Sequence, residues 1–100
     1  MKSFRTYQLA LELYRAIDFN KINGPLKDQL HRASLSIVLN LAEGSGKSGK
    51  ERKRFFQIAM GSLRETEACF DILGDKEKQE KVDRLAAHLY NLIRNPGPGT

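Results

Sequence analysis

The sequence has little that would support secretion, membrane insertion or disulfide bonding. Its one cysteine, Cys69, cannot form a disulfide within the chain, which agrees with a reducing cytoplasm. No stretch approaches the roughly 18 apolar residues of a membrane span, and the N-terminus lacks the continuous apolar run of a signal peptide. We therefore expect a cytoplasmic protein without a membrane segment, in which Cys69 fills a small space in the core rather than acting as a reactive thiol.

Motifs for metal or nucleotide binding are also scarce. His31 and His88 have no ligand partners at metal spacing, so the sequence predicts no metal site and no cofactor. Gly46-Lys47-Ser48 matches the end of a phosphate-binding P-loop, but Leu41 stands where that motif needs its first glycine, and a helical pattern precedes it instead of a strand.

Enzymatic activity is not expected either. An active site needs a nucleophile, a base and oxyanion donors that converge. The best set available is Glu43, Asn40 and Arg32, which no histidine, cysteine or second clustered acid accompanies.

What the sequence does contain is a series of amphipathic helical patterns. We expect helices from Ser3 to about Asp18, from about Pro25 to Glu43, from Gly49 to about Leu73, and from Asp75 onward. Gly44 would end the second helix, Ser48 with Glu51 would cap the third, and Gly74-Asp75 would join the last two as antiparallel neighbours. The chain of 100 residues is therefore predicted to be one all-α, antiparallel up-down four-helix bundle over residues 3–94, with a loose tail over residues 95–100.

The second helix has apolar residues on two sides. One stripe is the usual core-facing one, and the other consists of Leu35, Val38, Leu39 and Ala42. Leaving the second stripe in water would forgo about 5 kcal/mol of burial per chain, a large fraction of a typical net stability of about 5–15 kcal/mol. We expect this stripe to pack on another copy of the chain; the alternative is that helices of the same chain cover both sides.

A polar seam runs between the two stripes and includes Arg32, Ser36, Asn40 and Glu43. We predict a structural network in which Arg32 pairs with Glu43 or with Glu65 of the third helix, because buried charges are tolerated only when paired. A ligand site at Glu43 and Asn40 is the alternative. In the third helix, the small residues Ala59, Gly61 and Ser62 would let a neighbouring helix approach closely, and Gly61 in particular needs a packing reason.

A basic cluster marks the start of the third helix. The chain carries a formal net charge of +5 and has a pI near 9.6, which favours an anionic partner. The cluster and Arg64, further along the same helix, form the predicted nucleic-acid surface: Lys47, Lys50, Arg52, Lys53, Arg54 and Arg64. No aromatic residue in the cluster is free to stack on bases, so we expect binding to RNA or DNA without sequence specificity. The alternatives are a solvated basic helix start and a protein-binding scaffold.

Several blocks of the sequence match a known family pattern. These are Gln29-Leu30-His31-Arg32-Ala33, Ser36-Ile37, Asn40-Leu41-Ala42-Glu43-Gly44, Arg54-Phe55 and Ala59-Met60-Gly61-Ser62-Leu63-Arg64-Glu65. Together they resemble the bacterial four-helix-bundle family of 23S rRNA intervening-sequence proteins. The segment from Phe19 to Pro25 departs from the pattern, being shorter and lacking its aromatic-proline and acidic pairs.

The resemblance implies an antiparallel bundle that assembles as a homopentamer. It also implies distant similarity to the accessory protein of diversity-generating retroelements, which is basic, pentameric and associated with nucleic acid and a reverse transcriptase. From this resemblance we expect the chain's partners to be copies of itself and, in addition, RNA, DNA or a reverse transcriptase.

Overall fold

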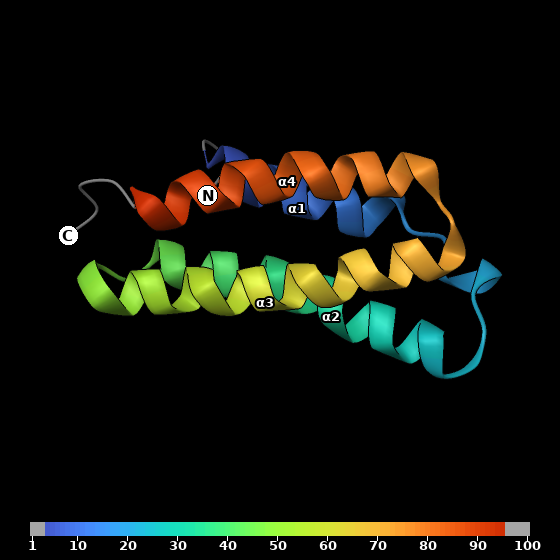
Figure 1. The fold of residues 1–100 in the computed structure, drawn as a ribbon. Coiled ribbons are helices and arrows are strands. Elements are labelled where there is room, and N and C mark those ends of the chain that lie inside the picture. Colours follow the sequence, from blue (N-terminus) through green and yellow to red (C-terminus); the bar gives the residue numbers. More distant parts are fainter. Residues whose placement is uncertain (1–3, 96–100) are drawn as a thin grey trace.

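The computed structural model describes residues 4–95 and shows an elongated all-helical molecule whose principal extents are 42 × 21 × 21 Å (Figure 1). Within these residues there is no strand, and the four α-helices are α1 (Arg5–Ala16), α2 (Gly24–Ser45), α3 (Gly49–Leu73) and α4 (Lys76–Arg94). A short 3-10 helix, η1 (Phe19–Lys21), lies between α1 and α2.

Each helix packs against two others. The most extensive contact joins α2 to α3, and further contacts join α3 to α4, α1 to α2 and α1 to α4. In Figure 1, α1 and α4 form one layer and α2 and α3 form the other. α2 and α3 run in opposite directions. Gly44, near the end of α2, lies beside Phe56 near the start of α3, and Ser36, in the middle of α2, forms a hydrogen bond with Ser62 in the middle of α3. Among the described residues, no helix is long and apolar enough to cross a membrane.

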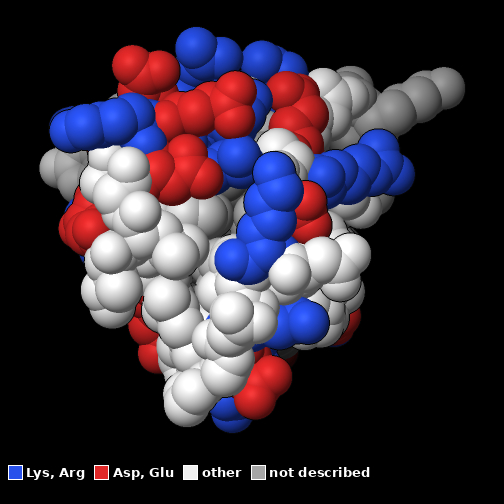
Figure 2. Space-filling model, turned by 90° about the vertical axis from the view of Figure 1, so that its right-hand side faces the viewer, with Lys and Arg blue, Asp and Glu red and all other residues white. Residues whose placement is uncertain are grey.

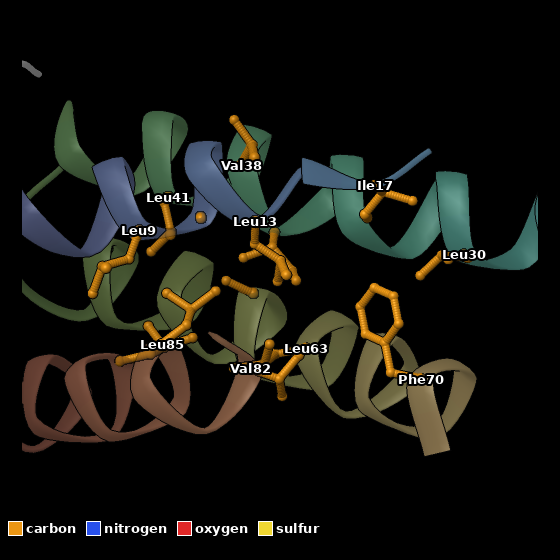
Figure 3. Close-up of a cluster of buried hydrophobic side chains, with 14 of the residues drawn as sticks. Leu9, Leu13, Ile17, Leu30, Val38, Leu41, Leu63, Phe70, Val82 and Leu85 are labelled. Carbon is orange, nitrogen blue, oxygen red and sulfur yellow. The ribbon is translucent and has the colours of Figure 1, made fainter. Parts of the chain in front are cut away.

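The core fills the space between the two layers, and every helix contributes to it (Figure 3). The largest fully buried apolar side chains are Phe56, Phe70, Leu13, Leu30, Ile37, Leu41, Leu63, Leu85, Leu89 and Val82. Two buried hydroxyls avoid the cost of an unpaired polar group by donating to carbonyls one turn earlier: Ser34 Oγ to Leu30 O at 2.7 Å and Thr66 Oγ1 to Ser62 O at 2.9 Å. The core-facing stripes predicted for α2 and α4 are confirmed. On α1 the prediction is wrong, because Leu9 and Leu13 are buried whereas Phe4, Tyr7, Leu11 and Tyr14 are only partly buried. On α3 the buried aromatic residue at the start of the helix is Phe56 and not Phe55, and Leu73 is 39% exposed.

The connection between α3 and α4 is as predicted. Gly74 has φ 67°, a left-handed conformation that glycine adopts without steric cost, and its N–H bonds to Asp71 O at 3.2 Å. Asp75 follows at once and caps α4, its carboxylate accepting from Lys78 N at 3.1 Å.

The connection between α2 and α3 differs from the prediction. Gly44 does not end α2; it is a buried residue inside the helix, which continues to Ser45. A Cβ at Gly44 would lie 2.7 Å from Cε1 of Phe56, so the glycine serves the close approach of α3 rather than a turn. Ser48 does occupy the N-cap position of α3, but its side chain makes no capping hydrogen bond.

The first connection also differs. α1 ends at Ala16, two residues before the predicted end, because Asp18 instead caps η1 by accepting from Asn20 N at 3.1 Å. Ile17 and Ile22 on either side of η1 are buried and close this end of the core. The predicted cap at Ser3 and residues 96–100 of the predicted tail lie outside the described residues.

Candidate nucleic-acid interface

The predicted basic surface lies where α2 ends and α3 begins. Lys47 stands in the connection, and Lys50, Lys53 and Arg54 lie in the first two turns of α3. The side chains of these last three residues are exposed. The close approach of α2 to α3 at Gly44 fixes the two helix ends that carry the cluster.

Three of these cations have no acidic partner. In the part of the chain that the structure describes, Lys50, Lys53 and Arg54 form no ion pair, and the Arg54 guanidinium instead lies over the Phe55 ring, 5.4 Å from its centroid. Positive charges near a helix N-terminus oppose the helix dipole. The cluster is thus positioned to accept an anion from outside the chain.

Lys47 and Arg64 are in exposed ion pairs. Lys47 Nζ lies 3.4 Å from Glu43 Oε2, and Arg64 Nη1 lies 3.4 Å from Glu67 Oε1. Exposed pairs of this kind contribute at most about 1 kcal/mol, so an incoming phosphate can replace either carboxylate. Arg64 is 11 residues beyond Lys53, a rise of about 16 Å along α3, and so lies apart from the cluster.

Arg52 has a different position from the one predicted. Its Nε donates to Gly44 O at 3.2 Å and to Lys47 O at 2.9 Å, and its Nη2 donates to Ser45 O at 3.1 Å. The last carbonyls of a helix have no partner within it and carry partial negative charge, so a guanidinium is well suited to cap them. Arg52 therefore holds the connection between α2 and α3 in place, and its contact with phosphate stays a prediction.

The predicted polar seam is partly present. Ser36 Oγ lies 2.7 Å from Ser62 Oγ, which links α2 to α3, and Asn40 Nδ2 donates to Ser36 O at 2.9 Å and to Ser36 Oγ at 3.0 Å. Ser62 was not assigned to this network from the sequence, although its place on the inner stripe of α3 was a signal for it. The network ties the two helices together.

The charged members of the seam do not meet. Arg32 and Glu43 are 11 residues apart on one helix, about 16 Å of rise, which is too far for an ion pair. Glu43 pairs with Lys47 instead, and within the described residues neither Arg32 nor Glu65 forms an ion pair. The predicted pairing of Arg32 with Glu43 or Glu65 is therefore wrong.

Glu65 does influence the buried Cys69. Burial, and secondarily the negative charge of Glu65, raise the pKa of the Cys69 thiol. The thiol is thus protonated and enclosed, in agreement with a core residue. No group of three His, Cys, Asp or Glu residues that could hold a metal ion occurs among residues 4–95.

The four residues of the predicted outer stripe of α2 differ in exposure. Leu39 is 56% exposed, and Leu35 and Ala42 are partly buried. Val38 is buried and belongs to the chain's own core, so its assignment to an interface between copies is wrong (Figure 3). Seen from the end that carries the α3–α4 connection, charged side chains of both signs crowd the upper part of the molecule, while uncharged side chains cover more of the lower part (Figure 2).

Comparisons with known proteins identify a family. Searches of curated proteins and of solved structures gave no significant match. The model of one family, described as 23S rRNA-intervening sequence protein, matches residues 3–95, which include every described helix. The chain therefore belongs to the 23S rRNA-intervening sequence protein family.

Proposed function

We propose that this chain is an up-down four-helix bundle that associates with copies of itself and binds nucleic acid, RNA in particular, without reading its sequence. The observation that carries the proposal is a set of three exposed cations at the start of α3 that have no acidic partner within residues 4–95, namely Lys50, Lys53 and Arg54. Lys47 joins them when a phosphate displaces Glu43. The mechanism is binding, with no chemical step.

A phosphate is the anion that this arrangement favours. Several ammonium and guanidinium groups along two helical turns match a backbone that carries repeated negative charges. Positive charges at this helix end have an unfavourable interaction with the dipole, and bound phosphates would remove it. The chain's net charge of +5 acts in the same direction by steering polyanions toward the protein.

Sequence-independent binding follows from what the surface lacks. Phe56 is 1% exposed and Phe55 is partly buried beneath Arg54, so neither ring presents a free face for base stacking. Lysine and arginine contacts to phosphates set position and affinity but carry no sequence information. RNA is favoured over DNA because the family description refers to 23S rRNA.

Self-association would strengthen this binding. Leu39, Leu35 and Ala42 give α2 an apolar outer face that a second copy would cover. The family resemblance favours a pentamer, in which weak phosphate contacts repeat around a ring and add through multivalency. The same resemblance makes a reverse transcriptase a candidate protein partner.

Fluorescence anisotropy with labelled duplex RNA and duplex DNA tests the proposal. The test variant reverses charge at Lys50 and Lys53 (K50E/K53E). The matched control reverses charge at two exposed residues of α4, Lys76 and Arg84 (K76E/R84E), and so changes the net charge by the same amount. All proteins are measured at low and at physiological salt, because phosphate contacts weaken steeply as salt rises.

We expect the wild type to bind at low salt, K50E/K53E to lose at least tenfold in affinity, and the control variant to lose much less. Equal losses in the two variants would show that net charge, and not the cluster, causes binding. Absence of binding by the wild type at low salt would contradict the nucleic-acid proposal and favour a protein scaffold, which would use the outer faces of α1 and α4.

A further inference from the structure

The outward face of α3 carries a second regular pattern, distinct from its core-facing stripe. Six exposed residues follow one another at alternating spacings of four and three: Arg54, Ile58, Gly61, Glu65, Ala68 and Ile72. Alternation of this kind is the seam along which one helix packs on another in a coiled coil. Ile58 is 41% exposed and Ile72 is 72% exposed, so the described part of the chain leaves apolar surface on this seam uncovered.

Gly61 has no structural reason within its own chain. It lies in the middle of a helix, where glycine costs about 1 kcal/mol relative to alanine. A Cβ built there would meet no atom within 4 Å, and Gly61 has no positive φ, so neither crowding nor backbone conformation requires glycine. Close approach of a group from outside the chain is the remaining physical reason.

The seam also carries two charged residues, Arg54 and Glu65. Arg54 and Glu65 make no ion pair within the described residues, and the 11 residues between them correspond to about 16 Å of helix rise. They therefore cannot meet within one chain. A second α3 running in the opposite direction would bring both charges into reach.

We infer that α3 pairs with α3 of a second copy, antiparallel and about a two-fold axis near residues 59 and 60. In this register Ile58 lies opposite Gly61 of the second copy, where the missing side chain leaves a space for it. Arg54 lies opposite Glu65 of the second copy. Both contacts occur twice, because a two-fold interface joins a surface to itself.

The rest of the seam fits the same register. Ala68 falls opposite Glu51, and Ile72 falls opposite Lys47 in the α2–α3 connection, so the pairing uses nearly the whole of α3. The small residues Gly61 and Ala68 allow the two helix axes to approach to about 8 Å, the lower end of the usual range. Neither Lys50 nor Lys53 takes part, so these two residues stay available for phosphate when the copies are paired, whereas Arg54 then faces Glu65 of the second copy.

This contact is different from a ring contact. A closed ring joins two different faces of neighbouring copies, whereas the α3 pairing joins one face to itself. It can therefore form a dimer or link two rings. The test below contains no nucleic acid, so its failure is distinguishable from failure of the proposed function.

The test uses charge reversal and mixing. Arg54→Glu places a glutamate opposite Glu65 of the second copy, and Glu65→Arg places an arginine opposite Arg54 of the second copy. Each variant alone therefore has like charges at both ends of the pairing. Each should associate at least tenfold more weakly than the wild type in sedimentation velocity. Mixing the two variants in equal amounts restores an acid opposite a base at both ends. The mixture should therefore recover most of the wild-type association.

Gly61→Ala provides an independent readout. Its methyl group meets nothing in its own chain but occupies the space for Ile58 of the second copy, so association should weaken while the dilute single chain becomes more resistant to urea. Wild-type association in both charge variants, or failure of mixing to restore association, would overturn the pairing. So would Gly61→Ala associating as strongly as the wild type.

Discussion

Two glycines in the α2/α3 pair, Gly44 and Gly61, offer a matched prediction about packing. Both lie inside helices, so replacing either by alanine gains the same helix propensity, about 1 kcal/mol. Their surroundings differ. A Cβ at Gly44 would lie 2.7 and 2.9 Å from two ring carbons of Phe56 and 3.1 Å from Cβ of Phe55, whereas at Gly61 it would meet nothing within 4 Å.

The contact at Gly44 is too short to relax locally. Phe56 is 1% exposed, and its ring is enclosed by the core, so α2 and α3 must separate to admit a methyl group. Overpacking of this kind costs up to about 3 kcal/mol, which leaves a net loss of about 2 kcal/mol for Gly44→Ala after the propensity gain. For a domain of this size that corresponds to a fall in Tm of roughly 10 °C.

Urea unfolding followed by circular dichroism measures the effect, at a protein concentration where sedimentation shows single chains. We expect Gly44→Ala to lower the free energy of unfolding by about 2 kcal/mol and Gly61→Ala to raise it by up to about 1 kcal/mol. Equal changes in the two variants would refute the packing argument, because the two substitutions differ only in their surroundings.

Three further predictions concern the site and its supports. Arg52→Ala should lower the free energy of unfolding by about 1–3 kcal/mol, because it leaves partly buried carbonyls of α2 without their hydrogen bonds. It should leave the salt dependence of nucleic-acid binding unchanged. A shallower salt dependence in the variant would show that Arg52 contacts phosphate. Because burial raises the pKa of the Cys69 thiol, the folded state holds this proton more tightly than the unfolded state, so stability should fall as pH rises past about 8.5, the ordinary thiol pKa. In Cys69→Ala, the part of this stability loss that comes from the thiol should be absent when the free energy of unfolding is measured by urea titration at several pH values. Identical pH profiles for the variant and the wild type would contradict this prediction. A double-mutant cycle of Ser36→Ala and Ser62→Ala should give a coupling of about 1 kcal/mol in the free energy of unfolding. If the two substitutions have additive effects, the hydrogen bond between Ser36 and Ser62 does not stabilise the contact of α2 with α3.

The helices could be predicted from the sequence because their signals are local. Apolar spacing on α3 and α4 sets the core-facing side of each helix, and Gly74-Asp75 specifies a left-handed residue followed by a cap, which the structure has. The role of Gly44 was predicted wrongly because two different requirements can place a glycine near a helix end. One is a turn with positive φ, and the other is the close approach of a neighbouring helix. Only the position of Phe56, a contact between helices, distinguishes them.

The site was harder to predict, because the role of a cation depends on its nearest acceptors. Lys50 and Arg52 are two residues apart with similar surroundings in the sequence. In the described part of the chain, however, Lys50 is exposed and forms no ion pair, whereas Arg52 caps α2. Val38 was assigned to the outer stripe of α2 from its helical spacing to Leu35 and Ala42. It also lies three residues before Leu41 of the core-facing stripe, and the structure buries it in the core.

The most direct test of the account is the slope of log affinity against log salt for duplex DNA, measured by anisotropy for the wild type and for Lys50→Ala/Lys53→Ala. If each lysine neutralises one phosphate, the variant's slope should be shallower by about 1.8, twice the value of about 0.9 per phosphate. A variant slope equal to that of the wild type would contradict the claim that the start of α3 binds the phosphate backbone.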